Sequence, residues 1–402
     1  MIPREVLKEV ILSQKESLNR LSLGIVREKQ IKIRDSFALI ITGIRRCGKS
    51  TFLHQILKKE KISYYLNLED PKLDGFELSD FNKVESLMNE LFGAKGVYYL
   101  DEIQNVDKWE KFVRYLIDKK EKVVLTGSNA SLLSKELGTK LTGRNLQIEL
   151  FPFSFKEFLL FKKEEPSLSS FEEYLYKGGF PEYLKTEDSS ILNALLSDVV
   201  MKDIAVRFGI KNTSTLNKIV IYLISNVGKE FSFNSIKKML EIKSVQSVID
   251  YISFFEKAYL IFTLPKFSYS YRVQQVSPKK VYSIDNGFSF NNSSSFSKDQ
   301  GKMLENMIFL ELRRSHKELF YFRDKKECDF LIKEKERIAS VIQVCFNLNE
   351  ENKEREFSGL IEAMAEFKLK DGLILTYEQE DEFVVDGKKI WVKPAWKWLL
   401  TQ

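Results

Sequence analysis

The segment Gly43-Ile44-Arg45-Arg46-Cys47-Gly48-Lys49-Ser50 satisfies the pattern G-x-x-x-x-G-K-[ST] at every fixed position, and it follows the apolar run Phe37-Ala38-Leu39-Ile40-Ile41. The apolar run predicts a buried strand, and residues 51–57 predict the start of a helix. A loop in this setting brings backbone N–H groups and a helix N-terminus together, which favours an anion. The sequence therefore predicts a phosphate-binding loop, against the alternative of a chance match in a glycine-containing turn.

Each residue type in this loop suits a task at a nucleotide. We expect Lys49 to reach the β- and γ-phosphates and Ser50 to ligate Mg²⁺. Gly43 and Gly48 allow the backbone to turn tightly and to approach the phosphates closely. The residues expected to contact ATP are Gly43, Arg45, Arg46, Cys47, Gly48, Lys49, Ser50, Thr51 and Ser128.

A pair of carboxylates follows a later apolar run, in Val97-Tyr98-Tyr99-Leu100-Asp101-Glu102. At the end of a strand, Asp101 is expected in the Mg²⁺ coordination sphere and Glu102 as the base that activates the attacking water. Adjacent acids are also common in turns. Downstream of a phosphate-binding loop, however, the catalytic interpretation is favoured.

Two further segments offer polar groups to the nucleotide. Thr126-Gly127-Ser128-Asn129 ends the next predicted strand, where Asn129 is expected to meet the γ-phosphate or to orient the water; the alternative is ordinary turn and capping chemistry. Arg144 precedes the last predicted strand and is expected to stabilise the transferred phosphate, in its own subunit or in a neighbouring one. The alternative for Arg144 is a surface ion pair with a nearby glutamate.

Strand and helix patterns alternate through the first part of the chain, which predicts an α/β fold with a parallel sheet and helices on both faces. We expect this nucleotide-binding core to span 1–160 and a helical connection to span 161–210. Three helices and a strand hairpin at 211–290 predict a winged helix. A smaller α/β domain is expected at 291–402, with the boundary near the serine- and asparagine-rich run 291–297.

Composition sets limits on the class of protein. The 402 residues include 63 Lys and Arg against 57 Asp and Glu, and a net charge of +6 does not by itself require a nucleic-acid partner. The 3 cysteines are far apart and there are 2 histidines, which argues against a disulfide framework or a histidine-based metal centre. Since no signal peptide or long apolar stretch is found, we expect a cytoplasmic protein with no membrane partner.

The predicted hairpin of the winged helix contains alternating aromatic residues. Phe267, Tyr269 and Tyr271 alternate with polar residues, and the favoured interpretation places these rings in the core. The alternative is a wing that touches the DNA backbone. Arg272 and the pair Lys279-Lys280 are left open as candidate DNA contacts.

Several of these motifs together resemble a prokaryotic family of AAA+ ATPases. The resemblance rests on the loop at 43–51, on Leu100-Asp101-Glu102-Ile103-Gln104, on the segments 126–129 and 141–158, and on Tyr176-Lys177-Gly178-Gly179-Phe180-Pro181-Glu182. It covers nearly the whole chain. It implies an AAA+ ATPase core, a winged helix, and a C-terminal domain similar to restriction endonucleases of the PD-(D/E)xK class.

The C-terminal domain departs from that implied pattern. Endonucleases of the class need carboxylates around Mg²⁺ and a cation near the nucleophile. Glu305 and Asp329 match the helix acid and the strand acid, but Gln343 and Cys345 stand where the pattern has Glu and Lys. A lysine of the hairpin at 333–335 is an alternative source of the cation. We therefore expect a degenerate nuclease-like site that does not cleave DNA.

Taken together, the sequence predicts an AAA+ protein that binds and hydrolyses ATP with Mg²⁺ and acts on DNA, or on a DNA-bound protein, through its C-terminal domains. The alternative is a nucleotide-dependent switch that regulates a protein partner without acting on DNA. DNA, a protein partner and a second copy of the chain are the candidate partners beside ATP and ADP.

Overall fold

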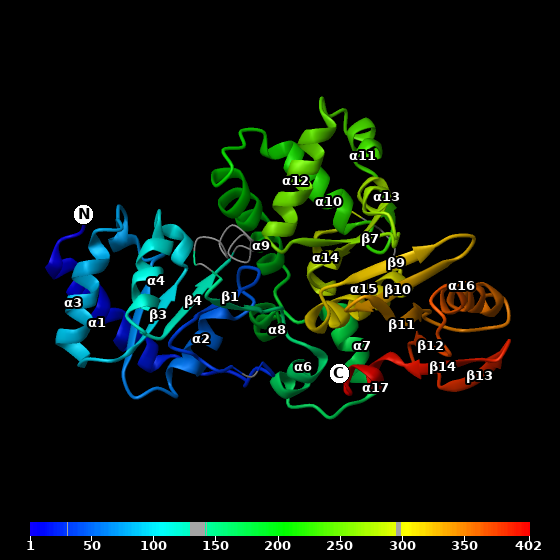
Figure 1. Ribbon diagram of the computed structural model, residues 1–402, viewed down its shortest axis with the longest axis horizontal. Coiled ribbons are helices and arrows are strands. Elements are labelled where there is room, and N and C mark those ends of the chain that lie inside the picture. The colour runs from blue at the N-terminus through cyan, green and yellow to red at the C-terminus, as the bar shows by residue number, and fades with distance from the viewer. Residues whose placement is uncertain (30, 129–140, 142, 295–298) are drawn as a thin grey trace. The chain divides into compact units, whose positions relative to one another are not determined.

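The computed structural model describes residues 1–29, 31–128, 141, 143–294 and 299–402 (Figure 1). The chain divides into two compact units, Met1–Phe151 and Pro152–Gln402, which are described separately. The finer division of the chain at residues 160, 210 and 290 stays a prediction. Within the described ranges, no helix has the length and apolar character needed to cross a membrane.

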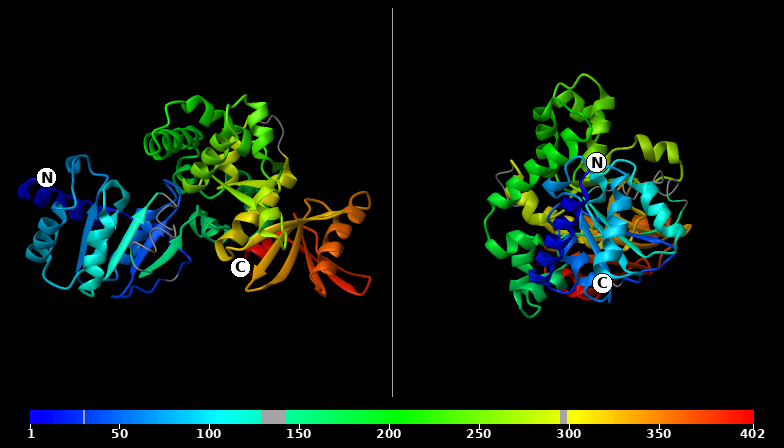
Figure 2. Two further views of the ribbon diagram at one scale, coloured as in Figure 1. Left: turned by 45° about the horizontal axis from the view of Figure 1, so that its top comes forward. Right: turned by 90° about the vertical axis from the view of Figure 1, so that its left-hand side faces the viewer.

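The first unit is built on a sheet of five parallel strands in the order β2-β3-β4-β1-β5 (Figure 2). The strands are β1 (Ala38–Thr42), β2 (Ser63–Asn67), β3 (Val97–Asp101), β4 (Val123–Gly127) and β5 (Asn145–Glu149). Every residue of β1, β3 and β4 is buried, because their apolar side chains meet helices on both faces of the sheet. The predicted α/β fold class is confirmed.

The helices of the first unit are amphipathic and pack their apolar faces onto this sheet. They are α1 (Arg4–Arg20), α2 (Lys49–Leu57), α3 (Asp80–Phe92) and α4 (Trp109–Asp118), with short 3₁₀ turns η1 (Pro71–Leu73) and η2 (Ile103–Asn105). Phe81 of α3 and Phe112 of α4 stack with ring centroids 4.1 Å apart. This packing leaves the carboxyl ends of the parallel strands together at one edge, where ligands of such sheets bind.

The second unit begins with helices and a small sheet. The helices are α6 (Phe155–Lys162), α7 (Leu168–Lys177), α8 (Pro181–Thr186), α9 (Ser190–Asp198), a π-helical segment (Val199–Val206), α10 (Thr213–Ile224), α11 (Phe233–Met239) and α12 (Val245–Lys257). The sheet has the order β6-β8-β7, with β6 (Glu230–Phe231), β7 (Ile261–Pro265) and β8 (Lys279–Ser283) antiparallel.

A β-rich part completes the second unit. Its six strands have the order β13-β14-β12-β11-β10-β9. They are β9 (Leu319–Arg323), β10 (Glu327–Glu334), β11 (Arg337–Val344), β12 (Asp371–Thr376), β13 (Asp381–Val385) and β14 (Lys388–Pro394). The accompanying helices are α14 (Asn286–Asn292), α15 (Gln300–Ser315), α16 (Lys353–Glu366) and α17 (Ala395–Leu399).

The aromatic hairpin residues do not all lie in the core. Phe267 is half-buried and packs edge-on against Phe320, but Tyr269 and Tyr271 are 79% and 74% exposed. The prediction that all three rings are core residues is therefore wrong. The physical reason is local: Ser270 caps a short helix, α13 (Tyr271–Val276), by accepting the Val273 N–H at 3.4 Å, so the chain leaves the extended conformation on which the alternation depends.

The Gly178-Gly179 pair in the segment 176–182 has a packing role. The buried Asp285 carboxylate accepts the Gly179 N–H at 2.6 Å and caps α14 by accepting the Phe288 N–H at 2.9 Å. A Cβ atom on Gly178 would lie 2.1 Å from the carboxylate oxygen Oδ1 of Asp285. Burial raises the pKa of Asp285 to about 6, although these N–H groups work to lower it.

Candidate functional site

The glycine-bounded loop joins the end of β1 to the start of α2 at the carboxyl edge of the sheet. Gly48 is the N-cap of α2 and has a φ of +98°, a backbone conformation that favours glycine. A Cβ atom on Gly43 would lie 2.1 Å from the Leu150 carbonyl oxygen, which follows β5. Both glycines are therefore required by the fold of this loop as well as by the approach of a ligand.

Lys49 is the first residue of α2, and its side chain is held inside the loop. Its ammonium donates to the carbonyl oxygens of Gly43 and Ile44, each at 3.1 Å, and lies 3.8 Å from Oε1 of Glu102. The residue is 5% exposed. The loop therefore carries a buried positive charge beneath the backbone that is expected to surround the phosphates.

Asp101 ends β3 and is held by neighbouring hydroxyl groups. Thr126 on β4 donates its hydroxyl to the Asp101 carboxylate, and Tyr65 donates at 3.1 Å. Burial, followed by the charge of Glu102, raises the pKa of Asp101, while hydrogen bonds from Thr126, Ser50 and Tyr65 work to lower it. Ser50 and Asp101 thus meet as two hard oxygen donors, a set that fits Mg²⁺.

Glu102 sits beside Asp101 in an unusual backbone conformation. Its φ is +52°, in the left-handed region that non-glycine residues seldom adopt, and its N–H donates to the Thr126 hydroxyl at 3.1 Å. Burial works to raise the pKa of Glu102, but the Lys49 ammonium and a hydrogen bond from Gln104 outweigh burial and lower it. The result is a buried, ionised carboxylate next to the loop, which is what a base for water activation requires.

The other loop residues occupy distinct positions. Arg45 donates to Oε1 of Glu69 at 2.9 Å, while the side chains of Arg46 and Thr51 are exposed. Cys47 is fully buried with its thiol 3.4 Å from the Leu150 carbonyl oxygen, and burial raises its pKa. Cys47 is therefore a packing residue whose backbone, rather than its thiol, lines the loop.

The residues predicted after β4 are only partly described. Ser128 is buried, and its hydroxyl lies 3.5 Å from Nε2 of Gln104, which in turn donates to Glu102. The structure thus brings Ser128 to the same edge as the carboxylates. Asn129 lies outside the described residues, and its role stays a prediction.

Arg144 lies at the opposite edge of the sheet. Its carbonyl oxygen accepts the Ala38 N–H at 3.1 Å, at the start of β1, whereas the loop follows the end of β1. A strand of this length spans about 13 Å. The guanidinium donates to Asp118 at 2.7 Å and forms an ion pair with it. A role at the nucleotide of its own chain is therefore disfavoured, and a role at a neighbouring copy stays a prediction.

Sequence reasoning missed three residues that hold the site together. Arg27, 7% exposed, donates to the Cys47 carbonyl oxygen at 3.0 Å and to the Phe151 carbonyl oxygen at 2.7 Å, so it ties the loop to the end of the first unit. No motif marks an arginine upstream of β1. Thr126 and Gln104 belong to the segments 126–129 and 100–104, but the sequence pattern indicates no separate task for either residue.

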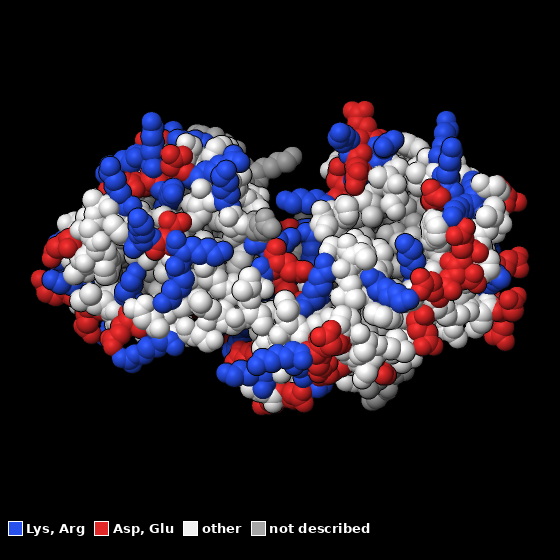
Figure 3. Space-filling model, turned by 90° about the horizontal axis from the view of Figure 1, so that it is seen from below, with Lys and Arg blue, Asp and Glu red and all other residues white. Residues whose placement is uncertain are grey.

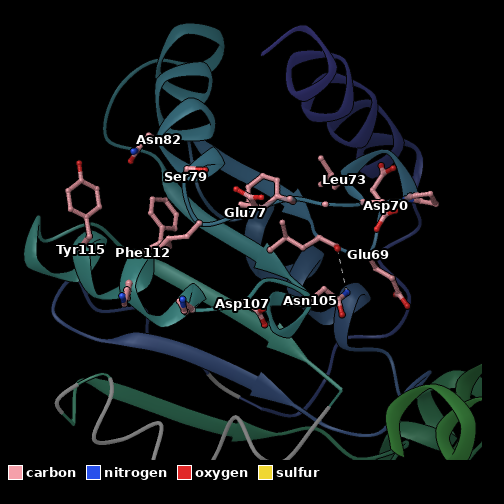
Figure 4. Close-up of a pocket in the computed structure, with 18 residues that line it drawn as sticks. Glu69, Asp70, Leu73, Glu77, Ser79, Asn82, Asn105, Asp107, Phe112 and Tyr115 are labelled. Carbon is pink, nitrogen blue, oxygen red and sulfur yellow. Dashed lines mark hydrogen bonds between the residues drawn. The ribbon is translucent and has the colours of Figure 1, made fainter. Parts of the chain in front are cut away.

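A wide polar pocket of about 1260 Å³ lies beside the nucleotide edge of the first unit. Figure 4 shows the carboxylates of Glu69, Asp70, Glu77 and Asp107 around it. Of the described residues predicted to bind nucleotide, none lines this pocket. Its connection to the loop is the ion pair between Glu69 and Arg45.

The predicted C-terminal cluster also comes together in space. Glu305 on α15, Asp329 on β10 and Gln343 on β11 line a pocket of about 760 Å³ in the second unit. Cys345 lines it too, with its thiol 3.2 Å from the Asn347 carbonyl oxygen. Lys333, a candidate replacement for the missing lysine, instead pairs with Glu318 at 2.8 Å.

A parallel sheet, a glycine-bounded loop before a helix, a buried lysine in that loop and an acidic pair ending a nearby strand define the class of P-loop nucleotide-binding domains. In agreement, residues 35–159 match the model of a family described as an AAA domain. Residues 168–294 and 300–398 match models of two domains of unknown function. The first unit is therefore an AAA-type P-loop domain.

The whole chain also has relatives. It is 36% identical to Uncharacterized protein MJ1544 of Methanocaldococcus jannaschii over 100% of this chain and 97% of that protein. The chain therefore belongs to the same family as this archaeal protein. It is also 29% identical to an uncharacterized protein of Haemophilus influenzae, over 90% of this chain and 95% of that protein.

Two solved structures show lower similarity. AMPPCP-bound DnaA from Aquifex aeolicus has 16% identity and a TM-score of 0.27, over 64% of this chain and 89% of that one. PCH-2 of C. elegans has 13% identity and a TM-score of 0.23, over 63% of this chain and 66% of that one.

Proposed function

We propose that the first unit binds ATP with Mg²⁺ and hydrolyses it to ADP and phosphate. One observation carries this proposal. Within one edge of the sheet, the Lys49 ammonium lies inside the loop, the Asp101 carboxylate accepts a hydrogen bond from Ser50, and Glu102 is a buried carboxylate of lowered pKa 3.8 Å from that ammonium. Phosphate charge, metal and attacking water each have a matching group there.

In this mechanism each residue has a distinct task. Lys49 would meet the β- and γ-phosphates, and Ser50 and Asp101 would hold Mg²⁺, which would neutralise charge on the phosphates. Glu102 accepts a proton from water as the water oxygen bonds to the γ-phosphorus and the bond to the bridging oxygen of ADP breaks. Thr126 positions the Asp101 carboxylate and the Glu102 backbone through its hydroxyl.

Two substitutions test the ATPase proposal. Lys49→Ala should abolish tight ATP binding, whereas Lys59→Ala, at an exposed lysine just after the same helix, should leave it intact. Glu102→Gln should keep ATP binding and slow hydrolysis by ~10²–10⁴. ATP affinity that is unchanged in Lys49→Ala would remove the loop from the mechanism, and native turnover in Glu102→Gln would require a different base.

For the second unit, we propose action on DNA or on a DNA-bound protein through a winged helix and a degenerate nuclease-like domain. The order of α10, β6, α11, α12, β7 and β8 supports this interpretation, since a winged helix has three helices and an antiparallel sheet. Arg272 is exposed and remains a candidate DNA contact. Lys280 does not, because its side chain is 2% exposed and pairs with carboxylates.

Salt dependence tests the DNA proposal. If Arg272 and other basic side chains contact phosphates, affinity for duplex DNA should fall steeply between low and moderate salt, and Arg272→Ala should reduce the slope. Binding that does not respond to salt would count against phosphate contacts. No cleavage of DNA in Mg²⁺ or Mn²⁺ is expected; cleavage that disappears in Asp329→Ala would contradict this expectation.

The alternative function is a nucleotide-dependent switch that acts on a protein partner. The observation in its favour is the apolar surface of α13, where Tyr271 is 74% and Val276 79% exposed, next to Tyr269. Figure 3 shows basic and acidic side chains interspersed on the visible face. Purification of Glu102→Gln with ATP separates the two functions, because copurified nucleic acid favours the first and a copurified protein without nucleic acid favours the second.

A further inference from the structure

The ammonium of Lys280 is buried among carboxylates of the C-terminal site. Lys280 belongs to β8, in the small sheet, and the residue is 1% exposed. Its Nζ atom lies 2.8 Å from Oδ1 of Asp329, 2.8 Å from Oε1 of Glu327 and 3.1 Å from Oε1 of Glu305. Two of its N–H groups donate to Glu305 and Asp329, and Glu327 completes the set of three carboxylates as an ion pair.

These distances suit an ammonium and do not suit a metal. The endonuclease-like resemblance implies a divalent cation held by Glu305 and Asp329, and Mg²⁺ binds oxygen at about 2.0–2.1 Å in a near-ideal octahedron. In the part of the chain that the structure describes, no three Asp, Glu, His or Cys side chains are placed to hold a metal ion. The expected metal site and the residues present therefore disagree.

Further hydrogen bonds occupy the carboxylate oxygens that a metal would need. Lys302 donates to Oε2 of Glu305 at 2.6 Å, and the Tyr282 hydroxyl donates to Oε1 of the same residue at 2.7 Å. Oδ2 of Asp329 accepts the Val344 N–H at 3.0 Å. Both oxygens of each carboxylate therefore already have donors from the chain.

Gln343, which stands where the endonuclease pattern has a carboxylate, joins the same network. Its side-chain oxygen accepts the Asp329 N–H at 3.2 Å, and its amide nitrogen donates to Oε2 of Glu356 at 2.8 Å. A neutral amide can make both bonds at once because it has a donor and an acceptor. A glutamate at this position would set two carboxylates against each other, so the Gln belongs to a metal-free arrangement.

The pKa shifts of Lys280 and Glu305 agree with the geometry of the cluster, whereas burial raises the pKa of Asp329 to about 6 although the Lys280 ammonium works to lower it. Burial works to lower the pKa of Lys280, but the charges of Asp329 and Glu305 outweigh it and raise the pKa well above its usual value. Burial likewise works to raise the pKa of Glu305, and Lys280 and Lys302 reverse the shift, so its pKa is lowered. The cluster is an internal ion network whose partners come from β8, α15 and β10.

We infer that the Lys280 ammonium occupies the place at which the resemblance expects a divalent cation, so that the site is closed to metal and fastens β8 to α15 and β10. The small sheet and the larger sheet of the second unit are thereby joined through this ion network. This inference goes beyond the proposed ATPase and does not depend on it, because every residue involved lies in the second unit.

A direct test is to titrate the nucleotide-free protein with Mn²⁺ and to measure the concentration of free Mn²⁺ by its electron paramagnetic resonance signal. We expect no saturable site attributable to the second unit. A saturable site that persists in Asp101→Asn but disappears in Asp329→Asn would overturn the inference. This measurement needs no substitution in the cluster to give a result on the wild-type chain.

A second test removes the ammonium. Lys280→Met keeps the length of the side chain and leaves three carboxylates around an uncharged methyl group, so this variant should melt at a clearly lower temperature than the wild type. Lys333→Met, at a lysine paired with Glu318 in the same unit, is the matched control and should melt close to the wild type. A Lys280→Met protein as stable as the wild type would contradict the inference.

If Lys280→Met does not fold, the double variant Lys280→Met/Glu305→Gln decides the matter. It removes one negative charge together with the positive one, so this double variant should fold and show a cooperative thermal transition. A double variant no more stable than the single variant would show that the ammonium does not balance Glu305, and the inference would fail.

Discussion

Thr126 is the residue whose replacement tests the geometry of the nucleotide site most directly. Its hydroxyl donates to the Asp101 carboxylate and accepts the Glu102 N–H at 3.1 Å. Thr126→Val keeps the shape of the side chain and removes both interactions. It therefore perturbs the Asp101 carboxylate and the Glu102 backbone without replacing either residue.

The magnitude follows from the two lost bonds. A hydrogen bond to a charged group contributes about 1.5–3 kcal/mol, and a buried N–H left without an acceptor costs about 1–3 kcal/mol. Because valine gains some apolar burial, we expect a net loss of about 3 kcal/mol in the free energy of unfolding of the first unit, or roughly 6–12 °C in melting temperature. If the substitution also removes about 1.4 kcal/mol of stabilisation from the transition state for hydrolysis, turnover falls ~10-fold.

The assay compares Thr126→Val with Thr126→Ser, which keeps the hydroxyl and loses only a methyl group. Urea unfolding of the nucleotide-free protein and steady-state ATP hydrolysis are measured for both. The serine variant should stay within about 1 kcal/mol of the wild type. A valine variant with wild-type stability and turnover would refute the argument that this hydroxyl holds Asp101 and Glu102 in place.

Three further results are expected. Arg144→Ala should lower turnover, by up to ~10³ if its guanidinium meets the γ-phosphate, and mixing it with Glu102→Gln should restore activity if Arg144 acts on a neighbouring copy; no rescue would exclude that arrangement. Gly178→Ala should lower the free energy of unfolding by ~2–4 kcal/mol, because the added Cβ atom would clash with Asp285. Gly209→Ala, also at positive φ but with nothing within 4 Å of its Cβ, should lower it by only ~1 kcal/mol; urea unfolding measures both. The pKa of Asp285 is raised from 3.8 to about 6, so its contribution to the free energy of unfolding is complete below pH 3.8 and is lost as pH rises through about 6. The stability of the wild type relative to Asp285→Asn should therefore fall by up to about 3 kcal/mol over that range. A stability difference that does not change with pH would contradict this expectation.

The sequence by itself was enough to predict the fold class of the first unit and the residues that meet at its loop. The fixed positions of the loop, the apolar runs and the acidic pair ending a strand are local patterns, and each depends on residues that are close together in the chain. Because parallel strands place their carboxyl ends at one edge, Lys49, Asp101 and Glu102 could be expected together without knowing the structure. The α/β class followed from the same alternation.

Only the tertiary structure decided which residues support that site. Arg27 reaches Cys47 and Phe151 across a long sequence separation, and the task of Thr126 depends on the pairing of β3 with β4. The edge on which Arg144 lies depends on β5 pairing with β1. A sequence pattern carries no information on such pairings, because hydrogen bonds between distant segments form only after the chain has folded.

The clearest case is Lys280. In the sequence it is one of two adjacent lysines in a candidate wing, a pattern that is typical of exposed, solvated charge. In the fold, β8 turns this side chain toward Glu305 and Asp329, 25 and 49 residues away, where its ammonium is buried. Local residue types determined that a strand would form here, but the direction of its side chains was set by packing between two sheets, which only the tertiary structure determines.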